Sequence, residues 1–221
     1  MNKGYKHELE FWKRFTTTTR FKNNWESPTP NPECQPETKT IIEAEIEGRK
    51  KYRVLDVGSG VVSILYGIVP IQNLFSCDPL ADKYAEIYDY DHSGAPKPEQ
   101  GYGENLPYPD NHFHIVHISN AIDHTENPAR VIAEMERVCK KDGVIIISGF
   151  VNEGEFEGYQ GLHQFNAHLI DGIDRKLFEI IDKAGRVIAV IDPGYNGEPI
   201  FADTKRLETW RDYFIFSYRK W

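Results

Sequence analysis

The feature that most constrains the fold is an alternation of short apolar runs with helix-like stretches through the middle of the chain. Residues 143–148 include three consecutive isoleucines, which is too continuous an apolar run for a strand with one face in water. Residues 127–140, which precede them, have their apolar side chains at helical spacing, and residues 113–119 form another strand-like run. The order strand, helix, strand is typical of a mostly parallel sheet covered by helices.

The same pattern predicts the remaining elements around this unit. Further strands are expected at residues 52–57, 73–77 and, more weakly, 100–103. The last part of the chain predicts a helix at about residues 174–184 and strands at 186–191 and 212–218. Because no helical pattern separates these two strands, we expect them to form an antiparallel pair at one side of the sheet.

The N-terminal residues predict a helical arm. Leu9, Trp12 and Phe15 recur at helical spacing within residues 5–16. Four threonines and then four prolines interrupt residues 16–38, so a loop or an ordered arm is expected there. A second helix is expected at residues 37–47.

Composition limits the partners and the compartment. With 221 residues the chain is long enough for one well-covered core, and its 26 Lys and Arg against 34 Asp and Glu argue against a nucleic-acid partner. Cys34, Cys77 and Cys139 are far apart and include no C-x-x-C pair, so neither a disulfide framework nor a zinc site is indicated. The N-terminus lacks the apolar core of a signal peptide, and no apolar run reaches the ~18 residues of a membrane span. A cytoplasmic protein without a membrane partner is therefore expected.

The clearest chemical motif is Val54 to Gly60, a buried strand that ends in an acid and two glycines. Glycine lets a ligand approach a tight strand-to-helix turn closely. A dinucleotide fingerprint would need a third glycine where Ser63 stands, and the Asp56 carboxylate would repel a pyrophosphate. The same carboxylate would attract a sulfonium and an ammonium group, which favours S-adenosylmethionine (SAM) over NAD. Asp78, after the second strand, is expected to accept hydrogen bonds from both hydroxyls of a ribose.

Several motifs between residues 50 and 150 resemble class I SAM-dependent methyltransferases, the large family that includes the ubiquinone and menaquinone biosynthesis methyltransferases. The matching residues are Val54 to Gly60, Asp78, Gly103 to Asn111 with Phe113, and Asn127, Pro128, Glu134, Arg137, Val138, Asp142 and Gly143. The resemblance implies an α/β, Rossmann-like three-layer sandwich. Its seven-stranded, mostly parallel sheet would have the strand order 3-2-1-4-5-7-6, with the last strand antiparallel. We expect residues 1–48 to be a helical arm or lid, and residues 49–221 to be one methyltransferase domain with a substrate-side insertion at about 151–172.

The motif residues and the resemblance together predict the SAM contacts. They are Asp56, Gly58, Ser59, Gly60, Asp78, Pro79, Gly103, Glu104, Asn105, Leu106, Asn120 and Ala121. The resemblance implies that the residues from Gly103 to Leu106 surround the adenine and that Asn120 and Ala121 pass the methionine end. Three positions depart from the family pattern: Tyr102 and His114 stand where aspartates are usual, and Val62 where a third glycine is usual. We expect these departures to alter SAM affinity without abolishing activity.

The acceptor side is less determined by the sequence. Asp123 and His124 stand where a general base would reach a substrate hydroxyl, although helix capping or pocket lining is the preferred interpretation of His124. The segment 152–170 is long and polar for a loop at the substrate edge. It suggests acceptor contacts from Tyr159, His163 and Gln164. The N-terminal helix suggests a further contact from Trp12 if the helix covers the pocket, and simple packing on the sheet is the alternative. His163 and His168 could be read as metal ligands with nearby glutamates, but unconnected histidines are the preferred interpretation, and no metal is expected.

The leading hypothesis is therefore a SAM-dependent methyltransferase that acts on a small polar molecule. O-methylation of a sugar or a natural-product intermediate is favoured, because residues 162–166 loosely resemble a run in bacterial methyltransferases of glycan and natural-product pathways. Methylation of nitrogen or carbon, and a non-catalytic SAM-binding protein, are the alternatives. The sequence leaves the acceptor, the methylated atom and the oligomeric state open.

Overall fold

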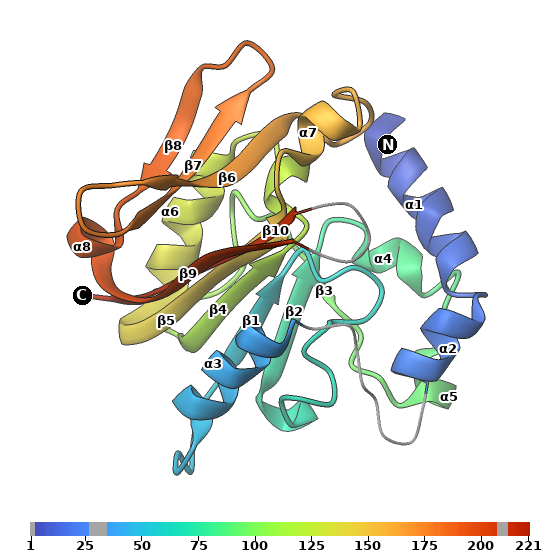
Figure 1. The fold of residues 1–221 in the computed structure, drawn as a ribbon. Helices are drawn as coiled ribbons and strands as arrows, with labels where there is room; N and C mark the ends of the chain where they lie inside the picture. The colour runs from blue at the N-terminus through green and yellow to red at the C-terminus, as the bar shows by residue number, and fades with distance from the viewer. Residues whose placement is uncertain (1–2, 27–34, 207–211) are drawn as a thin grey trace.

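A computed structural model describes residues 3–26, 35–206 and 212–221, with a seven-stranded sheet at the centre (Figure 1). Its strands are β1 (Val54–Val57), β2 (Leu74–Asp78), β3 (Glu99–Gln100), β4 (Phe113–Ser119), β5 (Cys139–Phe150), β9 (Gly197–Arg206) and β10 (Asp212–Lys220). Their order in the sheet is β3-β2-β1-β4-β5-β10-β9. The pairs among β1 to β5 are parallel, while β10 is antiparallel to both of its neighbours. Numbered within this sheet alone, the order is the predicted 3-2-1-4-5-7-6, and the antiparallel last strand is confirmed.

Helices cover both faces of the sheet and give it three layers (Figure 1). Helix α6 (Pro128–Val138) shares one apolar cluster with the sheet, and helix α3 (Pro36–Ile46) shares another on the opposite face. Successive side chains of a strand point to opposite faces, so Ile145 and Ile147 join the α6 cluster and Ile146 joins the α3 cluster. The isoleucine run is thus buried on both faces, as its sequence predicted. Four short helical turns complete this part: η1 (Ile71–Asn73), α4 (Ala81–Tyr84), α5 (Tyr90–Ser93) and η2 (Ile122–His124).

The N-terminal arm contains one helix more than predicted. Helix α1 (Lys3–Phe15) and α3 match the two predicted helices, but α2 (Thr19–Trp25) stands where a loop was expected. The hydroxyl of Thr18 accepts a hydrogen bond from the amide of Phe21, so the threonine run caps a helix instead of preventing one. The residues around Pro28, Pro30 and Pro32, on which the loop prediction also rested, lie outside the described residues.

Between β5 and β9 the chain forms a second, separate sheet. After the short helix α7 (Glu153–Phe156), strands β6 (Phe165–Asp171), β7 (Lys176–Asp182) and β8 (Val187–Ile191) pair antiparallel in that order, and α8 (Pro193–Asn196) follows. The prediction of a helix at residues 174–184 is wrong, because these residues include β7. Apolar residues at 177, 178, 180 and 181 fit a helical spacing, but pairing with a strand on each side decides the conformation.

The predicted antiparallel pair exists with a different partner. Residues 187–191 are a strand, close to the predicted 186–191, but this strand pairs with β7 in the second sheet. The partner of β10 is β9, which lies closer to it in sequence and was not predicted. The connection between β8 and β10 therefore contains a further strand that the sequence pattern did not reveal.

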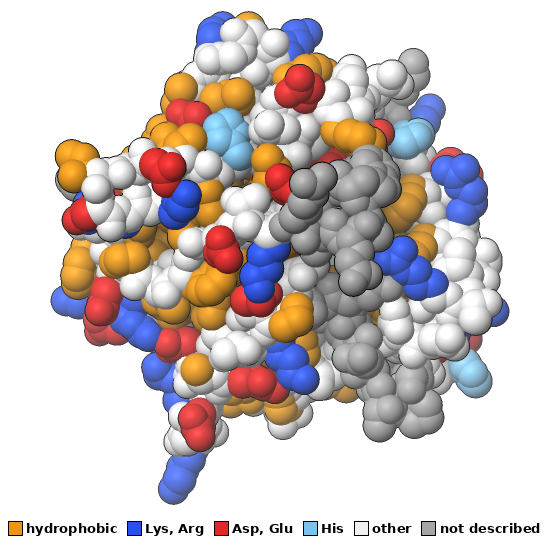
Figure 2. Space-filling view, viewed as in Figure 1, with side chains coloured by type: hydrophobic (Ala, Val, Ile, Leu, Met, Phe, Trp, Pro, Cys, Tyr) orange, Lys and Arg blue, Asp and Glu red, His pale blue; other side chains and the backbone are white. Residues whose placement is uncertain are grey.

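Three further observations concern surface and compartment. On the face seen in Figure 2, acidic and basic side chains are interspersed among the described residues. Within the part of the chain that the structure describes, no helix has both the length and the apolar composition needed to cross a membrane. Cys77 and Cys139 are buried free thiols, and Cys34 lies outside the described residues.

Candidate functional site

A cavity of about 510 Å³ opens where β1, β2, β4 and β5 end, which is the edge of such sheets where ligands bind. The predicted SAM contacts that line it are Asp56, Gly58, Ser59, Gly60, Asp78, Pro79, Gly103, Glu104, Asn120 and Ala121. Asn105 is exposed and Leu106 is buried in the core, and neither lines the cavity. Residues far apart in sequence are therefore brought to one cavity, as predicted, apart from these two.

The glycine turn after β1 is tied to the end of β2. The amides of Gly58 and Ser59 donate to the carbonyl oxygen of Cys77 at 2.9 and 3.3 Å. Gly58 and Gly60 both have φ of 65°, a left-handed conformation that side chains with a Cβ rarely adopt. A Cβ at Gly58 would also lie 2.6 Å from the Cβ of Ala121. Glycine is thus needed at Gly58 both for the turn and for the close approach of the segment after β4.

Asp78 is buried at the end of β2 and borders the cavity, but three internal donors already use its carboxylate. Oδ2 accepts from the amide of Gly60 at 3.0 Å, while Oδ1 accepts from the amide of Leu80 at 2.8 Å and the hydroxyl of Tyr84 at 2.9 Å. A carboxylate has about four acceptor positions, so one remains for a ligand in this conformation, whereas two were predicted. Burial raises the pKa of Asp78 to about 6, although the three hydrogen bonds act in the opposite direction.

Asp56 carries a partner that was not predicted. His117, its register neighbour on β4, places Nδ1 2.7 Å from Oδ1 of Asp56, and the hydroxyl of Ser63 donates to Oδ2 at 2.5 Å. Among the described residues, Nε2 of the buried His117 has no hydrogen-bond partner. A histidine in the middle of a buried strand was the sequence signal for this pair. The Asp56 carboxylate that lines the cavity is therefore also fixed by contacts with His117 of β4 and with Ser63, which follows the glycine turn.

The segment that follows Gly103 is clamped by helix α6. Oε2 of Glu134 accepts from the amide of Leu106 at 2.9 Å. The guanidinium of Arg137 donates to the carbonyl oxygens of Leu106 and Tyr108 at 3.0 and 2.8 Å, and also binds Glu134 at 2.8 Å. The motif residues Leu106, Glu134 and Arg137 thus form one hydrogen-bonded unit that fixes this wall of the cavity.

Glu104 contributes to the same wall in an unexpected way. Its carboxylate accepts hydrogen bonds from the amides of Glu126 and Asn127 at 2.9 and 3.2 Å, which fixes the start of α6. Tyr102, which replaces an aspartate of the family, is 48% exposed and does not line the cavity. Tyr5 of α1 lines this end instead, and burial together with the negative charge of its neighbours raises its pKa to about 12.

Two histidines and an aspartate meet at the acceptor end of the cavity. Asp123 and His124 belong to η2, directly after β4, and His163 lies in the loop between α7 and β6. His163 Nδ1 lies 2.7 Å from Oδ2 of Asp123 and 3.0 Å from Nε2 of His124, and all three residues line the cavity. Burial works against protonation of His163, but the contact with Asp123 raises its pKa overall. Of the two histidines, His163 is the closer partner of Asp123, because His124 Nε2 lies 3.6 Å away.

Two of the predicted acceptor contacts lie outside the cavity wall. Tyr159 and Gln164 do not line it, and the side chain of Gln164 donates to the carbonyl oxygen of Tyr159 at 3.1 Å within their own loop. His168 pairs with Glu179 of β7 at 3.1 Å. His163 is thus connected to other titratable side chains, contrary to the preferred interpretation, but His168 is not among them.

The other two departures from the family pattern also lie away from the cavity. His114 lies at the start of β4, and its two ring nitrogens contact the amide of Arg53 and the ammonium of Lys140, each at 3.1 Å. Burial and the nearby positive charge of Lys140 lower its pKa. Val62 is buried in the apolar cluster beneath α1 and α2. Both residues therefore act in packing and strand attachment.

Helix α1 lines one side of the cavity. Tyr5, His7, Glu8, Phe11 and Trp12 line it from this side. The indole of Trp12 rests on Gly60, where a Cβ would lie 2.2 Å from Cζ2 of the ring. At its start, α1 meets the loop before β6, since a Cβ at Gly4 would lie 2.5 Å from Leu162. One helix thus spans the glycine turn at one end and the histidine loop at the other.

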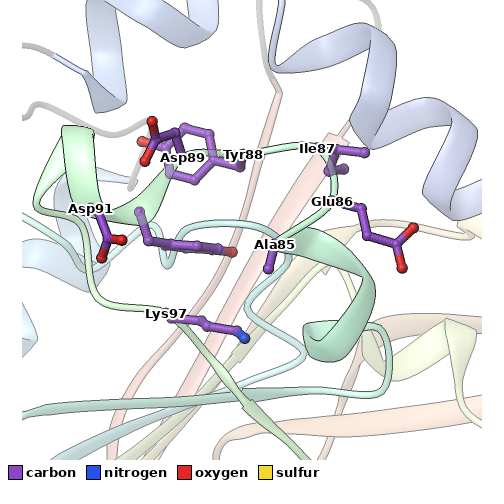
Figure 3. A pocket seen from close by; sticks show the side chains of 8 residues that line it. Ala85, Glu86, Ile87, Tyr88, Asp89, Asp91 and Lys97 are labelled. Atoms are coloured by element: carbon purple, nitrogen blue, oxygen red, sulfur yellow. The ribbon is translucent and has the colours of Figure 1, made fainter.

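A second hollow of about 600 Å³ lies beside α4 and α5 (Figure 3). One continuous stretch, residues 85–91, lines it together with Lys97. None of the predicted contacts belongs to it, and it lacks the converging strand ends that surround the first cavity. The cavity under α1 is therefore the candidate active site.

Comparisons with known proteins identify the kind of domain to which this part of the chain is similar. Residues 55–147 match a family model described as a methyltransferase domain. The uncharacterized methyltransferase YcgJ of Bacillus subtilis is 28% identical over 108 residues, which are 46% of this chain and 42% of that protein. The chain thus matches less than half the length of this relative.

Solved structures extend the likeness to the whole fold. The PH0226 protein of Pyrococcus horikoshii superposes over 100% of both chains with a TM-score of 0.54 and 14% identity. A SAM-dependent methyltransferase of Aquifex aeolicus superposes over 95% of this chain and 98% of its own, with a TM-score of 0.51 and 11% identity. At such identities the likeness concerns the fold alone. Residues 55–147 thus match a methyltransferase domain, and the chain shares the seven-stranded fold of solved proteins that include a SAM-dependent methyltransferase.

Proposed function

We propose that this protein transfers the methyl group of SAM to a hydroxyl oxygen of a small polar acceptor, such as a sugar or a natural-product intermediate. The observation that carries the proposal is the cluster of Asp123, His124 and His163, which lines the same cavity as the glycine turn. Ala121, two residues before this cluster, approaches Gly58 closely. The acceptor hydroxyl would therefore be activated beside the methyl group, where proximity and alignment lower the barrier most.

The cofactor half of the cavity fits SAM. The turn at Gly58 and Gly60 leaves no room for side chains, and Asp78 keeps one acceptor position for a ribose hydroxyl. A volume of about 510 Å³ lies within the usual range of about 300–1,000 Å³ for ligand pockets. In this proposal Gly103 and Glu104 lie beside the adenine, and Asn120 and Ala121 beside the methionine end. SAM supplies the methyl group as an electrophile, and the chain holds and aligns the two substrates.

SAM affinity should fall as the pH is lowered through about 6. A ribose hydroxyl donates to the ionised carboxylate of Asp78, whose pKa burial raises to about 6. Binding therefore favours the ionised form, and below this pH the Kd should increase by up to about tenfold per pH unit. Calorimetry at several pH values measures the effect. Asp78→Asn lacks the titrating group and serves as the control, whose weaker binding should change less over the same range.

Substitution of His163 should slow methyl transfer without affecting SAM binding. His163→Ala removes the contact with Asp123 that positions the acceptor cluster, and we expect transfer to slow by about 100-fold. The Kd for SAM should stay within about twofold, because Asp78 and the glycine turn are untouched. Single-turnover transfer from SAM, measured beside calorimetry, separates the two effects. His168→Ala is the matched control, since His168 also pairs with a carboxylate but outside the cavity.

The acceptor atom is tested directly with SAM that carries a deuterated methyl group. The enzyme is incubated with a panel of sugars, phenols and amines, and the products are located by mass spectrometry and their methylated atoms by NMR. A product with an O-methyl group supports the proposal, and transfer only to nitrogen or carbon contradicts it. SAM binding without transfer to any acceptor would support the alternative of a non-catalytic binding protein. The interspersed surface charges in Figure 2 favour a small acceptor over a long polyanion.

A further inference from the structure

The three side chains at the acceptor end present donor atoms to one point. Oδ2 of Asp123, Nε2 of His124 and Nδ1 of His163 are separated by 2.7, 3.0 and 3.6 Å. We propose that these atoms bind a single divalent transition-metal ion, which in turn binds the acceptor hydroxyl. The metal site deepens the proposed function and rests on it for the identity of the reaction, but metal binding itself does not depend on SAM.

Hydrogen bonding alone does not satisfy these three atoms. If Nδ1 of His163 carries a proton, that proton is shared between Asp123 and His124, which lie 2.7 and 3.0 Å away. If His124 donates the proton instead, the lone pair of His163 Nδ1 faces the carboxylate at 2.7 Å, and the two repel each other. A cation between the three atoms is attracted by all of them. A shared cation would therefore satisfy all three atoms, whereas a proton on His163 serves mainly the contact with Asp123.

The spacing of the donors suits a metal with three neighbouring ligands. Bonds of about 2.1 Å at right angles place the donor atoms about 3.0 Å apart, and tetrahedral angles place them about 3.4 Å apart. The observed separations between the three donor atoms range from 2.7 to 3.6 Å, and this range includes both calculated values. An ion about 1 Å out of the plane of the three atoms would be about 2.1 Å from each of them. Its remaining coordination positions would be open to other ligands.

The donor set selects the class of metal. Two imidazoles and one carboxylate favour Zn²⁺, Fe²⁺, Mn²⁺ or other first-row divalent ions, whereas Mg²⁺ and Ca²⁺ prefer oxygen donors. Asp123 is buried, and η2 and the histidine loop are joined by a hydrogen bond from the amide of Gln164 to the carbonyl oxygen of Asp123 at 3.1 Å. Glu153 and Glu157 line the same cavity and add negative charge beside His163. The site is thus fixed in shape and electrostatically attractive to a cation.

A metal here would change how the acceptor is activated. The acceptor hydroxyl binds an open coordination position, and its proton passes to water because the metal stabilises the alkoxide. The alkoxide oxygen then forms a bond to the methyl carbon while the carbon–sulfur bond breaks, and the electron pair of that bond remains on sulfur as a neutral thioether. In this scheme His124 is a metal ligand and not the general base expected from the sequence. Acceptors with a second oxygen close to the reacting hydroxyl are favoured, because they can chelate the ion.

The test titrates the metal-free protein with Zn²⁺, Mn²⁺, Co²⁺ and Mg²⁺ by calorimetry, and records the visible spectrum with Co²⁺. We expect one transition-metal ion per chain, absorption bands from coordinated Co²⁺, and no comparable binding of Mg²⁺. His124→Ala and His163→Gln should each weaken binding at least tenfold. His168→Ala should bind the metal like the unchanged protein. Thermal melting of every variant shows whether it is folded.

Three results would overturn the proposal: no transition-metal binding by the unchanged protein, binding that survives both substitutions, or equal loss in His168→Ala. The same preparations are titrated with SAM. Metal binding without SAM binding would contradict the proposed function and leave the metal site standing. SAM binding and O-methyl transfer without any metal would contradict the metal site and leave the proposed function standing. His124 and His163 would then have acid–base roles.

Discussion

Asp78→Ala should weaken SAM binding by about 10- to 100-fold. The substitution removes the acceptor for a ribose hydroxyl, and a hydrogen bond to a charged group contributes about 1.5–3 kcal/mol. It also removes the acceptor of the Gly60 amide, which holds the glycine turn to the end of β2. The first loss falls on the bound state alone, and each 1.4 kcal/mol is about a tenfold change in Kd. Calorimetry with SAM and with its demethylated product measures the change.

Two further variants make this result specific. Asp82→Ala removes the same charge from an exposed position four residues later and should leave the Kd unchanged. Tyr84→Phe removes the hydroxyl that donates to Oδ1 and opens a second acceptor position on Asp78. We therefore expect this variant to bind SAM several-fold more tightly. Unchanged binding in a folded Asp78→Ala protein would contradict the assignment of the ribose site.

Gly58→Ala should both destabilise the protein and abolish SAM binding. A side chain in the left-handed conformation costs about 1–2 kcal/mol. The new Cβ would also lie 2.6 Å from that of Ala121, and such overpacking costs about 1–3 kcal/mol more. Separation of the two segments to relieve the contact would move the end of β1 away from the segment after β4, between which the methionine part of SAM is proposed to lie. Urea denaturation and calorimetry measure the two effects.

Gly48→Ala separates strain from crowding. Gly48 has φ of 71°, but a Cβ there would meet nothing within 4 Å. We expect this variant to lose only the about 1–2 kcal/mol of conformational strain and to retain SAM binding. If Gly58→Ala were no less stable than Gly48→Ala, the close approach of Ala121 would have no energetic importance. If it also bound SAM normally, the glycine turn would not be part of the cofactor site.

The central sheet could be predicted because its strands are locally distinctive. Residues 113–119 match β4, and the continuous isoleucines of β5 require burial on both faces. The second sheet could not be predicted in the same way. The side chains of Lys176–Asp182 fit a helix as well as a strand, and only pairing with β6 and β8 makes them β7. The threonines before α2 are equally ambiguous, because Thr18 can end regular structure or cap a helix.

The proposed cofactor contacts could be predicted because they follow from the topology of the central sheet. The proposed acceptor contacts could not be predicted in this way. The residues from Val54 to Gly60 and Asp78 follow neighbouring strands, so their convergence is a consequence of sheet topology. His163 lies 40 residues beyond Asp123, and the contact between them depends on how the loop before β6 folds over η2. The pair of Asp56 and His117 depends on the register of β1 and β4, which sequence patterns do not specify.

The position of α1 has a consequence for the kinetics of the proposed methyl transfer. The helix rests on Gly60 with Trp12 and on Leu162 with Gly4, so one helix borders both halves of the cavity. In the proposed reaction, the demethylated cofactor and the methylated product would both leave the cavity beside this helix. We therefore expect exchange of both ligands to depend on a single opening event, and turnover to be limited by that event where the chemical step is faster. Accumulated demethylated cofactor would then inhibit the enzyme strongly, and its rapid removal by another enzyme would be a condition for sustained activity.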